Sequence, residues 1–87
     1  MSYEVRFARQ ALKDLELVKR SQLREKAFYI LSVLEINPWE PPYEELRENL
    51  KGCYSRRLNI QHRIVYSVNE AEKHVTILRM WTHYDKL

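Results

Sequence analysis

Apolar and polar residues alternate at the start of the chain and then change to a helical period. Tyr3-Glu4-Val5-Arg6-Phe7 alternates every second position, which is typical of a β-strand. From Ala8 to Lys19 the apolar residues recur every three or four positions, which predicts a helix with one buried stripe. That stripe contains Ala8, Ala11, Leu12, Leu15 and Val18, and the residues expected to face away from it are Lys13, Asp14 and Glu16.

The next segment predicts a second helix. Ser21 can cap its start, because a serine hydroxyl accepts a hydrogen bond from the backbone of the first turn. Asn37-Pro38 ends it. Because the two helices are close in sequence, we expect an antiparallel helical hairpin, with one continuous helix across Arg20-Ser21 as the alternative. The buried stripe of this second helix is expected to be Leu23, Ala27, Ile30, Leu31 and Leu34.

A stiff loop separates the helices from the rest of the chain. The run Pro38-Trp39-Glu40-Pro41-Pro42 cannot continue a helix, and we interpret Trp39 as a packing anchor within it. Residues Tyr43 to Leu50 are expected to form a short helical turn and then a loop. Lys51-Gly52 holds the only glycine of the chain and predicts a turn.

Two strands follow, over Cys53–Ile60 and Arg63–Val68, and their alternation predicts which side chains share a face. Arg56 and Val65 break the alternation. A two-residue turn would place Ile60 and Arg63 on the same face, so the pattern favours a longer turn or a bulge. The residues expected to face the helices are Leu58, Ile60, Ile64, Tyr66 and Val68, and those expected on the open face are Ser55, Arg57, Asn59 and Arg63.

The last strand completes the expected fold. Val75–Met80 is apolar at nearly every position, which predicts a central strand buried on both faces. The helices need a sheet to cover, so we expect an α+β fold in which two N-terminal helices pack on a small, mostly antiparallel twisted β-sheet. At 87 residues, the chain is expected to form a single domain over residues 1–87.

Composition excludes some classes of function. One cysteine, Cys53, allows no intrachain disulfide and no multi-cysteine zinc site. The three histidines lack the spacing of metal ligands, so we expect neither a metal nor another cofactor. We see no signal-peptide pattern and no apolar run long enough to span a bilayer, so the expected location is the cytoplasm, without a membrane partner.

The basic residues are clustered. The net charge of +3 and the isoelectric point of about 9.1 permit an anionic partner. Five basic residues fall within seventeen positions, in or beside the two central strands: Arg47, Lys51, Arg56, Arg57 and Arg63. Such a cluster is either a solvated strand face or a binding surface.

Residues near this cluster suit cleavage of RNA by its own 2′-hydroxyl. Glu44 is the candidate base that removes the hydroxyl proton. His83 is the candidate acid for the leaving 5′-oxygen, because imidazole has a pKa near ~6.5. Arg63 and Arg57 are candidate phosphate clamps, since a guanidinium donates paired hydrogen bonds to phosphate oxygens.

Two aromatic residues can add contacts to RNA, and each candidate residue also has an interpretation without a function. Tyr84 and Trp81 can stack on an unpaired base, a contact worth roughly 1–3 kcal/mol. His83 can equally be a solvated residue, and the arginines can form exposed ion pairs across the sheet, which stabilise a fold little. The residues alone therefore leave both RNA cleavage and plain RNA binding open.

Two motifs and a final pair run through the second half of the chain. They are the NLxGxxSRR run at 49–57, the HRxVY run at 62–66 and His83-Tyr84, accompanied by Glu44, Leu46 and Val68. With these residues the stretch from Glu44 to Tyr84 resembles the Txe/YoeB branch of the RelE-type toxins, within the RelE/ParE superfamily of toxin-antitoxin toxins. The N-terminal half is similar in layout only.

The resemblance implies a RelE-like fold and a ribosome-dependent mRNA endonuclease that cuts mRNA in the ribosomal A site without a metal and so inhibits translation. It also implies a cognate antitoxin that wraps the toxin, and homodimers occur in this branch. The implied catalytic residues are Glu44 as base, His83 as acid, Arg63 at the phosphate and Tyr84 at the nucleotide. The residues expected to contact RNA are Arg57, Arg56, Lys51, Arg47 and Trp81.

Two other functions compete with this interpretation. One is a non-catalytic RNA- or partner-binding module. The other is a toxin of the same fold directed at another target such as DNA gyrase, a class that tends to lack the Glu, Arg and His set found here.

The sequence also departs from the family pattern, because Asp85-Lys86-Leu87 follow the tyrosine that normally ends the chain.

Overall fold

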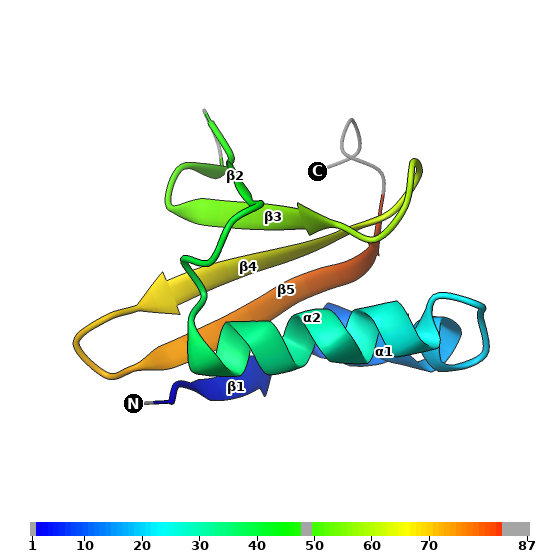
Figure 1. The fold of residues 1–87 in the computed structure, drawn as a ribbon, viewed down its shortest axis with the longest axis horizontal. Coiled ribbons are helices and arrows are strands. Elements are labelled where there is room, and N and C mark those ends of the chain that lie inside the picture. The colour runs from blue at the N-terminus through cyan, green and yellow to red at the C-terminus, as the bar shows by residue number, and fades with distance from the viewer. Residues whose placement is uncertain (1, 48–49, 83–87) are drawn as a thin grey trace.

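The structure, a computed structural model, describes residues 2–47 and 50–82. In these residues the elements are β1 (Glu4–Phe7), α1 (Arg9–Lys19), α2 (Arg24–Ile36), β2 (Glu44–Glu45), β3 (Cys53–Arg57), β4 (Arg63–Asn69) and β5 (His74–Thr82). The strands form one sheet in the order β1-β5-β4-β3-β2, shown in Figure 1. Only β1 and β5 pair in parallel, and the other neighbours are antiparallel. The predicted α+β fold class, with two helices on a mostly antiparallel sheet, is confirmed.

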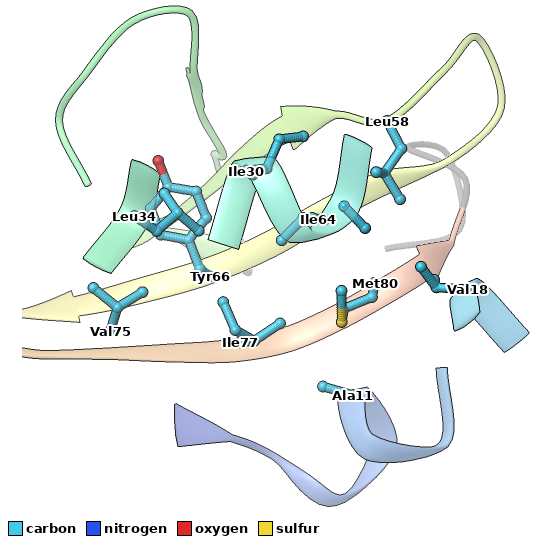
Figure 2. Packing of buried hydrophobic residues seen from close by; sticks show 11 residues of the cluster. Ala11, Val18, Ile30, Leu34, Leu58, Ile64, Tyr66, Val75, Ile77 and Met80 are labelled. Atoms are coloured by element: carbon cyan, nitrogen blue, oxygen red, sulfur yellow. The ribbon is translucent and has the colours of Figure 1, made fainter. Parts of the chain in front are cut away.

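Both helices pack on the same face of the sheet. Figure 2 shows their apolar side chains meeting those of β4 and β5, with Tyr66, Leu34 and Val75 at one end and Met80 and Val18 at the other. Burial of this apolar surface is the main stabilising contribution that the fold can make. The buried cluster consists of Ala11, Val18, Ala27, Ile30, Leu34, Leu58, Ile64, Tyr66, Val75, Ile77 and Met80.

Helix α1 is rotated relative to the prediction. Asp14, expected to face solvent, is only 2% exposed, whereas Leu12, expected in the buried stripe, is 51% exposed. The physical reason is that the Asp14 carboxylate accepts hydrogen bonds from the side chain of Arg79 and from the backbone of β5. These bonds satisfy a buried charge and turn this side of the helix toward the sheet.

The helices are separate, as the hairpin interpretation predicted, and the continuous-helix alternative is wrong. Ser21 lies in the connection rather than at the N-cap position, which Leu23 occupies without a side-chain cap. The Ser21 hydroxyl donates to the carbonyl of Val18 at 2.8 Å and accepts from the amide of Leu23 at 3.0 Å. It therefore links the end of α1 to the start of α2. Neither helix in the described part of the chain is long and apolar enough to cross a membrane.

The central hairpin is shorter than predicted. Strand β3 ends at Arg57 instead of Ile60, and Ile60 is 92% exposed instead of facing the helices. Its loop is held by the amides of Leu58 and Asn59, which both donate to the carbonyl of His62. The longer turn favoured by the pattern is thus confirmed, and it carries Ile60 away from the core.

Two further expectations about the strands are wrong, and a third holds in part. Within residues 43–50, Glu44–Glu45 form β2 beside β3, which was not expected, and the expected helical turn follows it, where Leu50 is in a 3-10 helix and its amide donates to the carbonyl of Arg47 at 3.3 Å. Ser55 and Arg63, expected on an open face, are buried, because the side chain of Arg63 packs over Ser55 and reaches β2. Strand β5 alternates between buried and half-buried residues instead of being buried on both faces. The predicted turn at Lys51-Gly52 is present, and Gly52 takes a φ of +91° that suits glycine.

Candidate active site

The loop that precedes β2 is fastened to the sheet at several points. The hydroxyl of Tyr66 donates to the carbonyl of Pro38 at 2.9 Å, from within the core. The guanidinium of Arg56 donates to the carbonyl of Glu40 at 2.6 Å. These bonds fix the segment that ends in Glu44, so the position of this carboxylate depends on buried contacts and not on a free loop.

Aromatic rings extend the same attachment. The ring of Trp39 meets those of Tyr43 and Tyr54 edge to face, with centroids 6.0 Å and 5.0 Å away. Its indole nitrogen donates to the carboxylate of Glu70 at 2.7 Å, and the hydroxyl of Tyr3 donates to the same oxygen at 2.7 Å. Trp39 is therefore the packing anchor that the sequence predicted.

The base candidate and the phosphate-binding candidate are in direct contact. Arg63 on β4 donates a hydrogen bond to the carboxylate of Glu44 on β2, and the same nitrogen lies 3.2 Å from the hydroxyl of Ser55 on β3. The sheet register explains this meeting, because Glu44 pairs with Ser55 and Ser55 pairs with Val65, two positions beyond Arg63. A basic group, an acidic group and a hydroxyl thus converge from three neighbouring strands. Ser55 had no predicted role in the site, and only its place within the SRR run could have suggested one.

The end of β5 lies beside this pair. Arg63 on β4 pairs with Thr82 on β5 and, on its other side, with Arg57 on β3. His83 directly follows Thr82 in the sequence. The predicted roles of His83 and Tyr84 fall on residues outside the described part of the chain.

The five residues predicted to contact RNA occupy different environments. Arg57 is exposed and lies next to Arg63, which suits the prediction. Arg56 is only 7% exposed and holds the loop carbonyl of Glu40, so its guanidinium has a structural task. The ring of Trp81 stacks on that of His62, with centroids 3.9 Å apart. Arg47 and Lys51 are exposed, at the β2–β3 connection.

A cleft opens between α2 and the β2–β3 edge of the sheet. Its volume is about 400 Å³, within the range of pockets that hold small molecules or parts of larger ones. It is mostly apolar, with cations and the Glu44 carboxylate along its lining. The lining residues are Lys26, Tyr29, Ile30, Pro42, Tyr43, Glu44, Ser55, Arg56 and Arg57. Residues 2–47 and 50–82 contain no cluster of His, Cys, Asp and Glu that could hold a metal ion.

This arrangement can bind and polarise a phosphodiester. A guanidinium suits a phosphate, because its planar fork donates paired hydrogen bonds to phosphate oxygens. Arg57, from the adjacent strand, adds a second positive charge near the same point. The Glu44 side chain is 59% exposed, so it is accessible to a hydroxyl of a bound substrate. The chemistry that these groups permit is therefore proton removal next to a clamped phosphate.

Solved structures of bacterial toxins share this architecture. The YoeB/ParE toxin from Agrobacterium tumefaciens superposes with a TM-score of 0.84 at 22% identity, covering 93% of this chain and 99% of that chain, which shows the fold. The structure of the YoeB dimer from Staphylococcus aureus has a TM-score of 0.81 at 29% identity, covering 97% of this chain and 100% of that chain. A YoeB–YefM complex from the same organism has a TM-score of 0.78, also at 29% identity, and again covers 97% of this chain and 100% of that chain. The fold is thus that of the RelE-like toxins.

Sequence comparison assigns the family. The model for the YoeB-like toxin of bacterial type II toxin-antitoxin systems matches residues 7–84. This chain belongs to that family. It is 36% identical to Toxin YoeB of Synechocystis sp. over 73 residues, which are 84% of this chain and 78% of that protein. The resemblance predicted from Glu44 to Tyr84 is confirmed, and it extends through most of the N-terminal half.

Proposed function

We propose that this toxin is a ribosome-dependent endoribonuclease that cleaves mRNA in the ribosomal A site by metal-free attack of the 2′-hydroxyl. The observation that carries the proposal is the contact of Glu44 with Arg63 at the cleft, beside Thr82, the residue before His83. Membership of the YoeB-like family supports a toxin role for the site.

The reaction assigns one task to each group. Glu44 takes the proton of the 2′-hydroxyl as its oxygen attacks the adjacent phosphorus. The bond from phosphorus to the 5′-oxygen breaks, and His83 donates a proton to that oxygen. Arg63 stabilises the charge that develops on the phosphate. Electrostatic stabilisation of this kind is usually the largest single contribution to the rate. The products are a 2′,3′-cyclic phosphate and a 5′-hydroxyl end.

Arg57 and Tyr84 complete the proposed site. Arg57 lies beside Arg63 and provides a second cation for the RNA backbone. Tyr84 positions the nucleotide. The few cations of the site favour a substrate held in place by the ribosome, because orientation of the 2′-hydroxyl contributes much of the rate of such a reaction. We therefore expect weak cleavage of free RNA.

The proposed partners are the ribosome with its mRNA and a cognate antitoxin, in the cytoplasm. The Staphylococcus aureus relatives, described as a YoeB–YefM complex and as a YoeB dimer, support an antitoxin and a homodimer for this chain too. The apolar cleft beside Glu44 suits either an RNA base or an antitoxin side chain, so toxin and antitoxin functions would compete there.

The test uses translating ribosomes programmed with a defined mRNA. Wild type, His83→Ala and Glu44→Gln are added, and breaks are mapped by primer extension. We expect a break in the A-site codon with wild type and its loss in both variants. Glu45→Gln, which alters the neighbouring exposed carboxylate of β2, is the matched control and should cut normally. Ribosome binding by wild type without any break would instead indicate a non-catalytic binding module.

A further inference from the structure

A buried carboxylate on α1 holds the end of the strand that leads to the candidate site. Asp14 is 2% exposed. Its Oδ2 accepts hydrogen bonds from the Arg79 side chain at 2.9 Å, from the amide of Met80 at 2.9 Å and from the amide of Trp81 at 3.3 Å. Its Oδ1 accepts from the side chain of Gln10 at 3.1 Å. The carboxylate thus meets two successive backbone amides of β5.

The sheet itself leaves these amides without a strand partner on the side of β1. Strand β1 pairs with β5 only as far as Phe7 opposite Ile77, and the amide of Ala8 makes the last of these bonds to the carbonyl of Ile77. The chain then turns into α1, while β5 continues to Thr82. Buried N–H groups are nearly always paired, because an unmade hydrogen bond destabilises the fold. Asp14 takes the place of the strand that is missing here.

The pairing of β5 with β4 is irregular over the same residues. The register shifts between Arg63 and Val65, and again between Val65 and Tyr66. A bulge of this kind bends a strand and re-aims the residues beyond it. Pairing with β4 changes register twice, so it does not by itself fix the path of Met80 to Thr82. Asp14 adds a second constraint from the other side of β5, where β1 has ended.

We propose that Asp14 is a positioning residue for the catalytic end of β5. It fixes the path of the strand so that Thr82, which directly precedes His83 in the sequence, stands opposite Arg63. This inference rests on the proposed function for its effect on cleavage, but its effect on the strand is independent of that function. A displacement of about 1 Å at a reacting group is sufficient to reduce a rate by about 100-fold.

Three variants separate positioning from stability. Asp14→Ala removes the acceptor. Asp14→Asn keeps one acceptor oxygen for the β5 amides and gives up the charge and the second acceptor, which faces Gln10. Leu34→Ala is the control, because it weakens the core near Val75, at the end of the cluster opposite Met80 (Figure 2). All three are compared at a temperature at which each is folded.

The first measurement is amide hydrogen exchange of the isolated protein. In Asp14→Ala we expect the protection of Met80 and Trp81 to fall by at least about tenfold more than that of Ile64 in the core. Leu34→Ala should lower protection throughout the sheet without this difference, and Asp14→Asn should restore most of it. Equal losses at Trp81 and Ile64 in Asp14→Ala would overturn the proposal, whether or not the protein cleaves RNA.

The second measurement is single-turnover cleavage of ribosome-bound mRNA. We expect Asp14→Ala to lower the maximal rate by about 10- to 100-fold while its affinity for ribosomes stays within about threefold. Asp14→Asn should cleave within about threefold of wild type. If Asp14→Ala does not fold, a full-rate Asp14→Leu variant, which lacks any acceptor, would overturn the proposal. Wild type that never cleaves would refute the proposed function, while the exchange result would still decide the role of Asp14 in the strand.

Discussion

Arg63 and Glu44 are joined by a hydrogen bond across the width of β3, although they are 19 residues apart in the sequence. Their burial is unequal, with the arginine side chain 10% exposed and the glutamate side chain 59% exposed. The cation is therefore fixed by the sheet and the anion is presented to the cleft. This division suits a site in which the arginine stays in place and the carboxylate exchanges a proton with a substrate.

Replacement of Glu44 should affect catalysis far more than stability. Glu44→Gln removes only the charge of an exposed side chain, so the free energy of unfolding should fall by about 1 kcal/mol. Glu44→Gln keeps an oxygen that can accept from Arg63, but it cannot take a proton, so the cleavage rate should fall by about 100-fold or more. Urea unfolding and primer extension on the same samples measure both effects. Normal cleavage by Glu44→Gln would exclude this residue as the base.

Neighbouring arginines on β3 should behave in opposite ways. Arg56 is buried and donates to the carbonyl of Glu40, so Arg56→Gln should lower the free energy of unfolding by about 1–3 kcal/mol. Arg57 is exposed, so Arg57→Gln should leave stability within about 0.5 kcal/mol of wild type and slow cleavage. The two variants carry the same change one position apart and therefore act as controls for each other in urea melts and cleavage assays.

The stacked pair of Trp81 and His62 gives a third test. Trp81 was predicted from the sequence to contact RNA, but its ring lies on the ring of His62 at 3.9 Å. Loss of a half-buried aromatic side chain should destabilise the fold by about 1–3 kcal/mol in Trp81→Ala, and by less in Trp81→Phe, which keeps a ring. Thermal unfolding measures this. An unchanged melting temperature together with weaker ribosome binding would favour the RNA contact instead.

Local patterns were sufficient for the two helices and for most strands, because periodicity reports directly on which residues face a core. They failed at Asp14, since a carboxylate within a helix normally faces solvent, and its partners Arg79 and Met80 lie 65 and 66 residues away. They failed at Ile60 for a related reason. An alternating pattern does not show where a strand stops, and the five-residue loop depends on the carbonyl of His62.

The candidate site divides in the same way. Glu44, Arg63 and Arg57 of the SRR motif were candidates from their chemistry and from the family resemblance, and they lie close together because β2, β3 and β4 are adjacent. Arg56 belongs to the same motif, but its environment could not be inferred, because the carbonyl that it binds belongs to the proline-rich loop 16 residues earlier. A motif therefore indicates which residue types occur together. The burial and the hydrogen-bond partners of each motif residue are known only from the folded structure.

Acid should weaken the fold through Glu70, which joins three separate segments of the chain. Hydrogen bonds from Lys73, Tyr3 and Trp39, in that order of influence, lower the pKa of Glu70 to about 2. The ordinary pKa of this carboxyl is about 4.5, so the folded state holds it ionised more firmly than the unfolded chain does. Its contribution to stability is therefore complete above the unfolded pKa and disappears as the pH falls from about 4.5 toward 2.

Asp14 acts in the same direction. Burial alone would raise its pKa, but hydrogen bonds from Arg79, the amide of Met80 and Gln10 outweigh burial and lower it. A variant that lacks only the Glu70 charge should separate the two carboxylates. We expect Glu70→Gln to melt below wild type at pH 7 and to converge with wild type near pH 2, while the remaining acid sensitivity of the variant includes the contribution of Asp14.

The control for this pH series is Glu72→Gln, which removes the same charge from an exposed position two residues away. Melting temperatures of the three proteins between pH 7 and pH 2 make the comparison. If Glu70→Gln and Glu72→Gln follow the same curve, the loss reflects overall charge and not the bonds to Lys73, Tyr3 and Trp39. If Glu70→Gln melts below wild type at pH 7 and meets it only in acid, while Glu72→Gln follows wild type throughout, the bonds to Glu70 hold Tyr3 and the proline-rich loop to the β4–β5 turn, because protonation and substitution both remove the charge that strengthens them.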